Sequence, residues 1–192
     1  MKRNPALPGL LAFAILALVG CDGSPGAAAP GSSASLVAPA VELSAGMADT
    51  DGAEWAALRR ATAKYHRIEV ALDDGFFAPD GECVEVEGLG GMGVHYVHPD
   101  NLNDALVDPE KPDALLYEPQ KNGHMRLVGA EFVIWRDVWG DPPGPTFLGR
   151  DFDQSFGEHS HGLPDHYELH LWIWRDNPAG IMTPFNPAVR CP

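Results

Sequence analysis

The stretch His166-Tyr-Glu-Leu-His-Leu-Trp-Ile-Trp174 decides the fold, because its side chains alternate between apolar and polar or aromatic kinds. Successive residues of a β-strand point to opposite faces of a sheet. One face of this strand would then be apolar and suited to a core: Leu169, Leu171 and Ile173. The other face would carry His166, Glu168, His170, Trp172 and Trp174. We therefore expect a half-buried strand with a histidine-bearing face.

Four further runs rich in β-branched and aromatic residues precede this strand, separated by turns rich in Pro, Gly and Asn. They are Cys83–Val86, Val94–Val97, Ala114–Tyr117 and Leu127–Trp135. Before them, apolar residues recur every three or four positions from Trp55 to Leu72, which predicts a helix that ends near Gly75. The order predicts an α+β domain: one N-terminal helix packed on an antiparallel β-sheet with long Pro- and Gly-rich loops.

The first twenty residues have the composition of an export signal. Their uninterrupted apolar run, Leu10 to Val19, is too short to span a membrane, which takes roughly 20 residues. It leads into Leu18-Val-Gly-Cys21, which resembles the lipobox of bacterial lipoproteins. The resemblance implies cleavage after residue 20 and lipid on the sulfur of Cys21, which would anchor the chain to a membrane of the cell envelope, on its extracytoplasmic side. An ordinary signal peptide with a chance cysteine is the alternative.

The three cysteines fit this interpretation. An odd number in an exported protein leaves one thiol unexplained, and lipid on Cys21 would account for it. Cys83 and Cys191 then remain as a pair, which predicts a disulfide in an oxidising compartment. Two buried thiols are the alternative.

Composition divides the chain into three parts. Residues 1–20 are the predicted signal, and residues 21–49, rich in Gly, Ala, Ser and Pro, are predicted to be a flexible tether. Residues 50–192 suffice for a single α+β domain. Within it, residues 136–165 are long for a connection, and such segments are often functional.

The predicted mature chain is strongly acidic. Removal of residues 1–20 takes away two of the 13 basic residues, so the net charge becomes −16 (11 basic minus 27 acidic residues). Nucleic acid is excluded as a partner, because phosphates require a basic surface. The same charge argues against a chain that lies flat on an anionic bilayer.

The polar face of the last strand suggests a metal site. His166, Glu168 and His170 share that face, and neighbours two apart are separated by about 6.8 Å, close enough to reach one ion. His166 and His170 are about 13 Å apart, which is too far without a bend. We therefore expect either Glu168 with one of these histidines or His170 with ligands from other segments. The candidates for those ligands are His95, Glu131 and His161.

Imidazoles with a carboxylate suit a transition metal ion, namely zinc, copper or non-haem iron. A site with three protein ligands and an open position would activate water. The alternative is that these histidines are ordinary core or surface residues, some hydrogen-bonded to carbonyl groups. Four tryptophans offer a different binding site, an aromatic platform for a sugar or apolar ligand, although core packing is the more common reason for buried tryptophans. They are Trp135, Trp139, Trp172 and Trp174.

Two motif matches are rejected on their structural context. His166-x-Glu-x-His170 is not the helical His-Glu-x-x-His of zinc proteases, since β-forming residues follow it. Gly88-x-Gly-x-x-Gly93 matches the dinucleotide fingerprint, yet the next segment is not helical. We interpret these glycines as a tight turn or as a place where two backbones approach closely.

Five motifs spread over most of residues 60–191 suggest a relationship. They are Gly91-Met-Gly-Val-His-Tyr-Val97, Leu116-Tyr-Glu-Pro119, Arg126-Leu-Val-Gly-Ala-Glu131, His166-Tyr-Glu-Leu-His-Leu-Trp172 and Asn177-Pro-Ala-Gly180. Together they resemble a family of uncharacterised bacterial secreted proteins. The resemblance implies a single domain and no particular activity.

Three functions remain open at this point. The first is a membrane-anchored envelope lipoprotein that binds a transition metal ion or a small ligand through a histidine-rich pocket. The second is a metal-dependent hydrolytic enzyme with Glu131 or Glu168 as base. The third is a structural envelope protein. The pattern identifies no protein partner.

Overall fold

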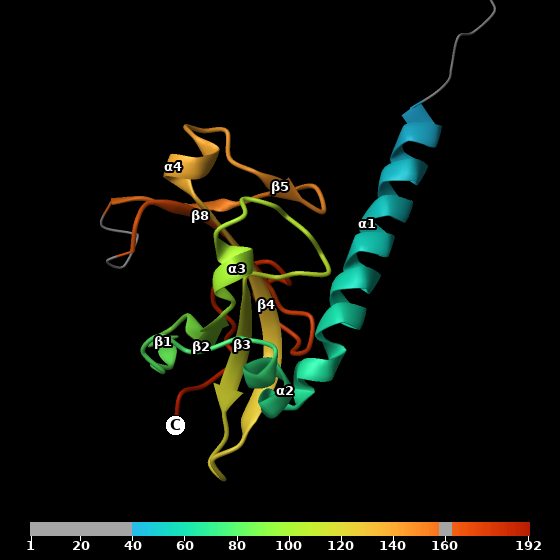
Figure 1. Ribbon diagram of the computed structural model, residues 1–192. Helices are drawn as coiled ribbons and strands as arrows, with labels where there is room; N and C mark the ends of the chain where they lie inside the picture. Colours follow the sequence, from blue (N-terminus) through green and yellow to red (C-terminus); the bar gives the residue numbers. More distant parts are fainter. Residues whose placement is uncertain (1–39, 158–162) are drawn as a thin grey trace, which may run out of the picture. The chain divides into compact units, whose positions relative to one another are not determined.

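The computed structural model describes residues 40–157 and 163–192, which belong to one compact unit (Figure 1). Its centre is a curled, six-stranded antiparallel sheet in the order β1-β2-β3-β4-β8-β7. The predicted mixed α+β class with an antiparallel sheet is confirmed. The strands of this sheet are β1 Val84–Val86, β2 Gly90–Val97, β3 Ala114–Pro119, β4 Met125–Trp135, β7 Asp153–Ser155 and β8 His166–Leu171.

The helical part that precedes the sheet has three pieces: α1 Ala40–Thr62, the 3-10 helix η1 Ala63–His66 and α2 Ile68–Asp73. Arg67 separates the last two with an extended backbone, φ −99° and ψ 107°. The end of α2 is a Schellman motif, in which Phe76 N–H donates to Ala71 O (2.9 Å) and Gly75 N–H donates to Leu72 O (3.1 Å). Gly75 supplies the left-handed conformation that this motif requires, with φ +102°.

One face of the sheet forms the main core with the helices. Leu58 of α1 is fully buried among side chains of β4 and β8: Ala130, Phe132, Leu169 and Leu171. Tyr65 and Ala71 pack on the neighbouring strands β3 and β4, against Leu115, Tyr117 and Leu127. The Tyr117 hydroxyl also donates a hydrogen bond to the carbonyl of Tyr65 (2.7 Å). The expected apolar face of β8 is therefore the face that packs on the core.

The opposite face of the sheet is partly covered by the end of the chain. Val189 packs there with Leu116, Val128 and Trp172 in a smaller apolar cluster. Trp172 is held by a hydrogen bond from its indole N–H to the carbonyl of Thr183 (2.6 Å). The rest of this face carries the polar side chains described below.

The prediction that Trp174 shares a face with Trp172 is wrong. Strand β8 ends at Leu171, so the alternation of the strand does not extend to either tryptophan. Trp174 packs instead against the clusters on the helix side of the sheet. The guanidinium of Arg59 lies 4.2 Å from its ring centroid, and the ring of His66 meets it edge-on at 4.4 Å.

The segment predicted as a long connection contains short elements. They are α4 Arg136–Trp139, the two-stranded sheet of β5 Thr146–Phe147 and β6 Arg150–Asp151, and then β7. A further short helix, α3 Pro99–Leu102, lies between β2 and β3. Because β7 pairs with β8, this segment adds the edge strand next to the histidine-bearing strand.

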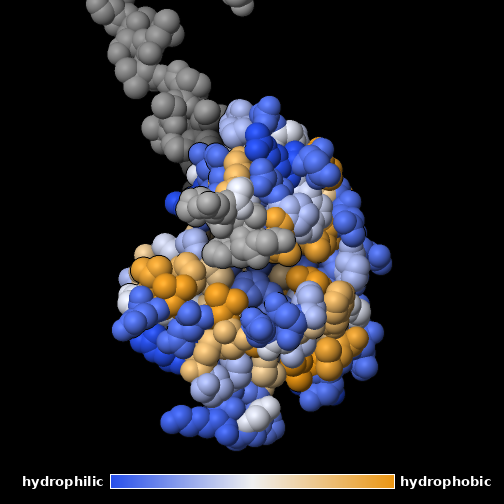
Figure 2. Space-filling model, turned by 90° about the vertical axis from the view of Figure 1, so that its left-hand side faces the viewer, coloured by the Kyte–Doolittle hydropathy of each residue, from blue (hydrophilic) through white to orange (hydrophobic). Residues whose placement is uncertain are grey.

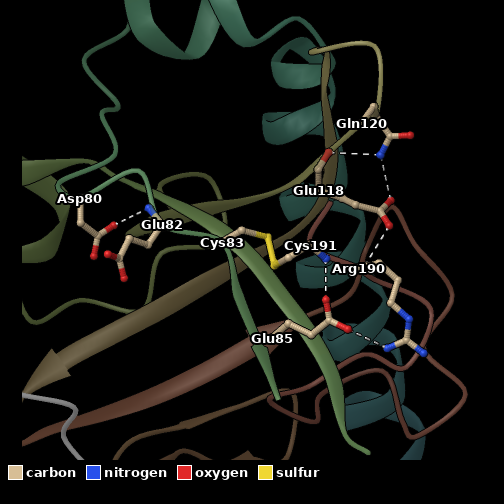
Figure 3. The surroundings of a disulfide bond; sticks show 8 residues. All are labelled: Asp80, Glu82, Cys83, Glu85, Glu118, Gln120, Arg190 and Cys191. Carbon is tan, nitrogen blue, oxygen red and sulfur yellow. Dashed lines mark hydrogen bonds and ion pairs between the residues drawn. A yellow bond between two sulfur atoms is a disulfide. The ribbon is translucent and has the colours of Figure 1, made fainter. Parts of the chain in front are cut away.

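The predicted disulfide between Cys83 and Cys191 is present and ties the end of the chain to the start of β1 (Figure 3). Glu85 reinforces the tie, because its carboxylate accepts hydrogen bonds from the Cys191 backbone N–H (2.7 Å) and from the Arg190 guanidinium (3.2 Å). Glu118 accepts another from the Arg190 backbone N–H (3.2 Å). The C-terminal residues are thereby fastened to two strands of the sheet.

The interpretation of the glycine motif as a close approach of backbones is confirmed. A Cβ on Gly90 would lie 2.3 Å from the carbonyl oxygen of Asn186, and one on Gly93 would lie 2.4 Å from that of Tyr117. Both residues also have positive φ, +102° and +88°. Any other side chain at either position would push the C-terminal segment or β3 away from β2.

Several predictions fall on residues outside the described part: the signal of residues 1–20, lipidation of Cys21, the tether as far as residue 39, and His161. From Ala40 onward the chain is in α1. No helix among the described residues is long and apolar enough to cross a bilayer. Apolar side chains nevertheless reach the surface, including Leu72, Leu89 and Leu163, and Figure 2 shows apolar patches among hydrophilic residues on one side.

Candidate metal centre

Three strands of the sheet bring His95, Glu131 and His170 together on the face opposite the main core. Each residue offers one ligand atom, and these atoms all lie within 4.8 Å of one another. Glu131 of β4 and His170 of β8 are direct partners in the antiparallel register. His95 comes from β2, two strands away from Glu131. This group could hold a metal ion.

The intervening strand β3 leaves room for His95 to reach Glu131. Ala114 of β3 is paired with Glu131 on one side and with Val97 on the other, so it shares their face of the sheet. It is completely buried and presents a single methyl group between the two outer strands. A larger side chain at this position would fill the space over which the imidazole and the carboxylate meet.

The three side chains leave room for an ion between them, with each histidine facing a different oxygen of Glu131 and the three ligand atoms within 4.8 Å of one another. Nε2 of His95 lies 3.5 Å from Oε2 of Glu131, and Nε2 of His170 lies 3.6 Å from Oε1 of Glu131. Ligands at zinc distances of about 2.0–2.2 Å are roughly 3.3–3.6 Å apart in a tetrahedron. Ordinary N–H···O hydrogen bonds are shorter, about 2.7–3.2 Å. The two imidazole rings are mutually perpendicular, with centroids 5.8 Å apart.

His170 is the least satisfied of the three side chains. It is 1% exposed, and neither of its ring nitrogens has a hydrogen-bond partner among the residues that the structure describes. A buried polar atom without a partner costs about 1–3 kcal/mol. This cost applies to each of the two ring nitrogens of His170. A metal ion bound to one of them would remove the cost for that nitrogen. Glu131 is also buried, whereas the His95 side chain is 24% exposed and gives the site a side toward solvent.

The electrostatic environment keeps both imidazoles in the form that binds metals. Burial lowers the pKa of His95 to about 4, with a further contribution from His170. Burial also lowers the pKa of His170. Both rings are therefore neutral at pH 7, with a lone pair available. Burial and the nearby Glu168 carboxylate raise the pKa of Glu131, so that a cation would displace a proton from it.

His166 and Glu168 form a hydrogen-bonded pair beside this group. Nδ1–H of His166 donates to Pro164 O (2.8 Å), and Nε2–H faces Glu168 Oε2 at 3.3 Å. The Ser155 hydroxyl donates to Glu168 Oε1 (2.9 Å). Against the effect of burial, the hydrogen bonds to Glu168 and Pro164 raise the pKa of His166. Burial alone would raise the pKa of Glu168, but the hydrogen bond from His166 and other contacts lower it to about 2. The contact between the two side chains thus favours the charged form of each.

Of the two arrangements considered from the sequence, the structure assembles three candidate ligands only for His170, with His95 and Glu131, among the residues that it describes. Glu168 pairs with His166 of its own strand. His166 and Glu168 share the face of His170, as β8 pairing with β4 requires. His98 serves the fold instead, because its Nε2–H donates to the carbonyl of Asp74 (3.0 Å). Ala114 could not be recognised from the sequence, because its role depends on the strand order.

The four tryptophans do not form a shared platform. Trp135 meets the His166 ring edge-on at 5.7 Å, and the indole of Trp139 donates to Pro143 O (3.1 Å). Trp172 and Trp174 belong to different clusters on the two faces of the sheet. The interpretation as one aromatic binding surface is therefore wrong.

Two surface pockets of the described residues lie away from the three candidate ligands. One, of about 550 Å³, is lined by Arg136, Asp137, Gly140, Asp141, Pro164 and Asp165. Another, of about 380 Å³, is lined by Arg126, Trp174, Arg175, Asp176, Pro178 and Ala188. Neither includes His95, Glu131 or His170.

Comparison with models of protein families, with curated proteins and with solved structures finds no match to this chain. The similarity to uncharacterised secreted proteins thus stays a prediction, and the site is interpreted from its own geometry.

Proposed function

We propose that this chain is an envelope lipoprotein, anchored through Cys21, whose sheet binds one transition metal ion through His95, Glu131 and His170. The observation that carries the proposal is the buried His170, whose two ring nitrogens have no partner in the described part of the chain although a carboxylate lies 3.6 Å away. A core position normally takes an apolar residue or a satisfied polar one. A ligand role explains why an imidazole stands there.

The chemical type of the three ligands narrows the choice of metal ion. Two neutral imidazoles and one carboxylate are intermediate to hard ligands, which suit zinc, copper or non-haem iron rather than calcium or magnesium. Each histidine lies 3.5–3.6 Å from a different oxygen of Glu131, close to the separation of neighbouring ligands around a tetrahedral ion. We therefore propose zinc as the first ion to test.

The location in the cell envelope is supported by two separate features. The Leu18-Val-Gly-Cys21 sequence resembles a lipobox. The disulfide between Cys83 and Cys191 is of the kind that persists in oxidising compartments. Replacement of Cys21 by Ser should release the protein from the membrane fraction of the producing bacterium. Retention of the variant in that fraction would count against the lipid anchor.

Metal binding is tested with protein that carries no histidine tag. Wild type should bind one Zn²⁺ per chain in a titration, and His170→Ala should abolish this binding. His124→Ala is the matched control, because His124 is an exposed histidine outside the candidate centre. Equal binding by wild type and His170→Ala would remove His170 from the site.

A second candidate function is metal-dependent hydrolysis. It is favoured by the number of ligands, since three protein ligands would leave a position for water, and by Glu168, an ionised carboxylate beside Glu131. Glu168→Gln should then preserve Zn²⁺ binding and abolish hydrolysis of an activated ester such as p-nitrophenyl acetate. Zinc-loaded wild type without any such activity would favour the binding role.

A further inference from the structure

We propose that Asp153 orients His170 in the metal-loaded protein, by accepting a hydrogen bond from its Nδ1–H while Nε2 binds the ion. The inference rests on the proposed metal site and assigns it a positioning residue on a strand that contributes no ligand. Metal-binding histidines generally donate their other ring N–H to a carboxylate, a carbonyl or water. His170 lacks such an acceptor among the described residues.

The orientation of the ring decides which nitrogen needs the acceptor. Nε2 of His170 is the atom that faces Glu131, at 3.6 Å, and Nε2 of His95 faces the same carboxylate from the other side. Nε2 is therefore the atom available to the ion, and the proton of the neutral ring belongs on Nδ1. Nδ1 is buried, so an acceptor for its proton has to come from the protein or from an enclosed water molecule.

Asp153 is placed to be that acceptor. It lies on β7, directly opposite Glu168 in the pairing with β8, and so shares the face of the sheet with His170, two residues further along β8. Arg150 holds one oxygen, with its guanidinium 3.0 Å from Oδ1. The other oxygen, Oδ2, is buried and has no partner within residues 40–157 and 163–192. A buried donor and a buried acceptor thus lie on neighbouring strands, each without a partner.

The other carboxylates near His170 are already committed. Glu131 is a proposed ligand, and both oxygens of Glu168 accept hydrogen bonds, from Ser155 and from His166. The charge of Asp153 acts on His170, because it raises the pKa of that imidazole against the larger effect of burial. This effect requires the two side chains to be electrostatic neighbours. On binding the ion, the His170 ring would turn so that Nδ1–H meets Oδ2.

The experiment compares Zn²⁺ affinity and the His170 ring in four variants. Asp153→Ala removes the acceptor, and Asp153→Asn keeps a neutral acceptor oxygen. Asp151→Asn is the control, because it removes a nearby exposed charge. His170→Ala removes the proposed ligand. Affinity is measured by competition with a chelating dye. The protonated ring nitrogen is identified by ¹⁵N–¹H NMR of the histidine side chains in the zinc-loaded protein.

We expect Asp153→Ala to lower the affinity by about 10- to 100-fold, the range seen when such partners are removed. Asp153→Asn should recover part of the loss, and Asp151→Asn should match wild type within about twofold. The NMR spectrum of wild type should show a proton on Nδ1 of His170, slow to exchange, and that proton should exchange rapidly in Asp153→Ala. If the alanine variant fails to fold, the same comparison is made with Asp153→Asn, which preserves the shape of the side chain.

Two failures are distinguishable. If wild type binds Zn²⁺ and His170→Ala does not, while Asp153→Ala retains both wild-type affinity and the slowly exchanging proton, the role of Asp153 is overturned and the metal site stands. If wild type itself binds neither Zn²⁺ nor copper or iron ions, the metal site and the role of Asp153 are both overturned.

Discussion

Nε2 of His170 lies 3.6 Å from Oε1 of Glu131, its direct partner across strands β8 and β4. The gap is too long for a good hydrogen bond, and the imidazole has no other partner among the described residues. Two groups that would bind each other are thus held slightly apart in a buried place. An ion between them, bound also by His95, accounts for this separation better than a structural role does.

This arrangement predicts that metal binding is gained at the expense of stability. His170→Leu, measured in the presence of a chelator, should be as stable as wild type to within about 1 kcal/mol, or more stable, because it replaces two unsatisfied nitrogens by an apolar side chain of similar size. Urea unfolding of both proteins in EDTA tests this. A loss of more than about 2 kcal/mol would indicate that His170 supports the fold.

The methyl group of Ala114 should control access of His95 to Glu131. Ala114→Leu is expected to reduce Zn²⁺ affinity by at least about tenfold and to cost about 1–3 kcal/mol of stability through overpacking. Ala130→Leu is the matched control, because Ala130 is equally buried but belongs to the main core. It should show a similar loss of stability in chemical denaturation with unchanged affinity. Equal effects of both variants on affinity would contradict the role of Ala114.

Asp113 should make the stability of the folded protein decrease as the pH rises. Burial raises the pKa of this carboxyl group to about 7, against a hydrogen bond from the Val133 backbone N–H. A raised pKa in an acid means that the folded state holds the proton more tightly than the unfolded state. The contribution of Asp113 to stability is therefore complete below its ordinary value near 3.8, declines as the pH rises, and is lost above about 7.

Asp113→Asn tests this contribution, because an amide cannot ionise and its oxygen can still accept from Val133. The variant should gain stability relative to wild type between pH 4 and pH 8, by at most roughly 4 kcal/mol for a shift of about three pH units. Unfolding free energies of the two proteins at several pH values provide the comparison. A difference that is independent of pH would show that Asp113 ionises normally in the folded protein.

The disulfide should stabilise the domain by restricting its unfolded state. Cys83 and Cys191 are 108 residues apart, and the chain-entropy model gives roughly 4–5 kcal/mol for a loop of this size. Unfolding in the presence of a reductant should show a loss of this order. The Cys83→Ser, Cys191→Ser double variant should behave like reduced wild type, and a fully stable double variant would contradict the expected contribution.

The sheet could be predicted from the sequence because its strands are runs rich in β-branched and aromatic residues bounded by Pro, Gly and Asn, and because the last strand alternates with period two. The predicted Leu127–Trp135 strand corresponds to β4, Met125–Trp135, and the face shared by His166, Glu168 and His170 follows from the alternation itself. β7 escaped prediction because three residues are too few to show a period. Trp174 was misplaced because alternation cannot reveal where a strand ends.

The residues of the candidate site could be predicted from the sequence, but their meeting in space could not. His95, Glu131 and His170 were each singled out by residue type, but their meeting depends on the strand order β2-β3-β4-β8. Pairing across strands that are distant in the sequence leaves no local signal. Ala114 and Asp153 contribute through neighbours on other strands, so their own surroundings in the sequence do not mark them.

The most direct test of the metal centre is the zinc content of tag-free protein, measured by mass spectrometry of the element after exposure to Zn²⁺ and removal of the excess. The account predicts one zinc ion per chain in wild type and in His124→Ala, and none in His170→Ala. Wild type with no bound zinc, copper or iron after equivalent treatment would contradict it.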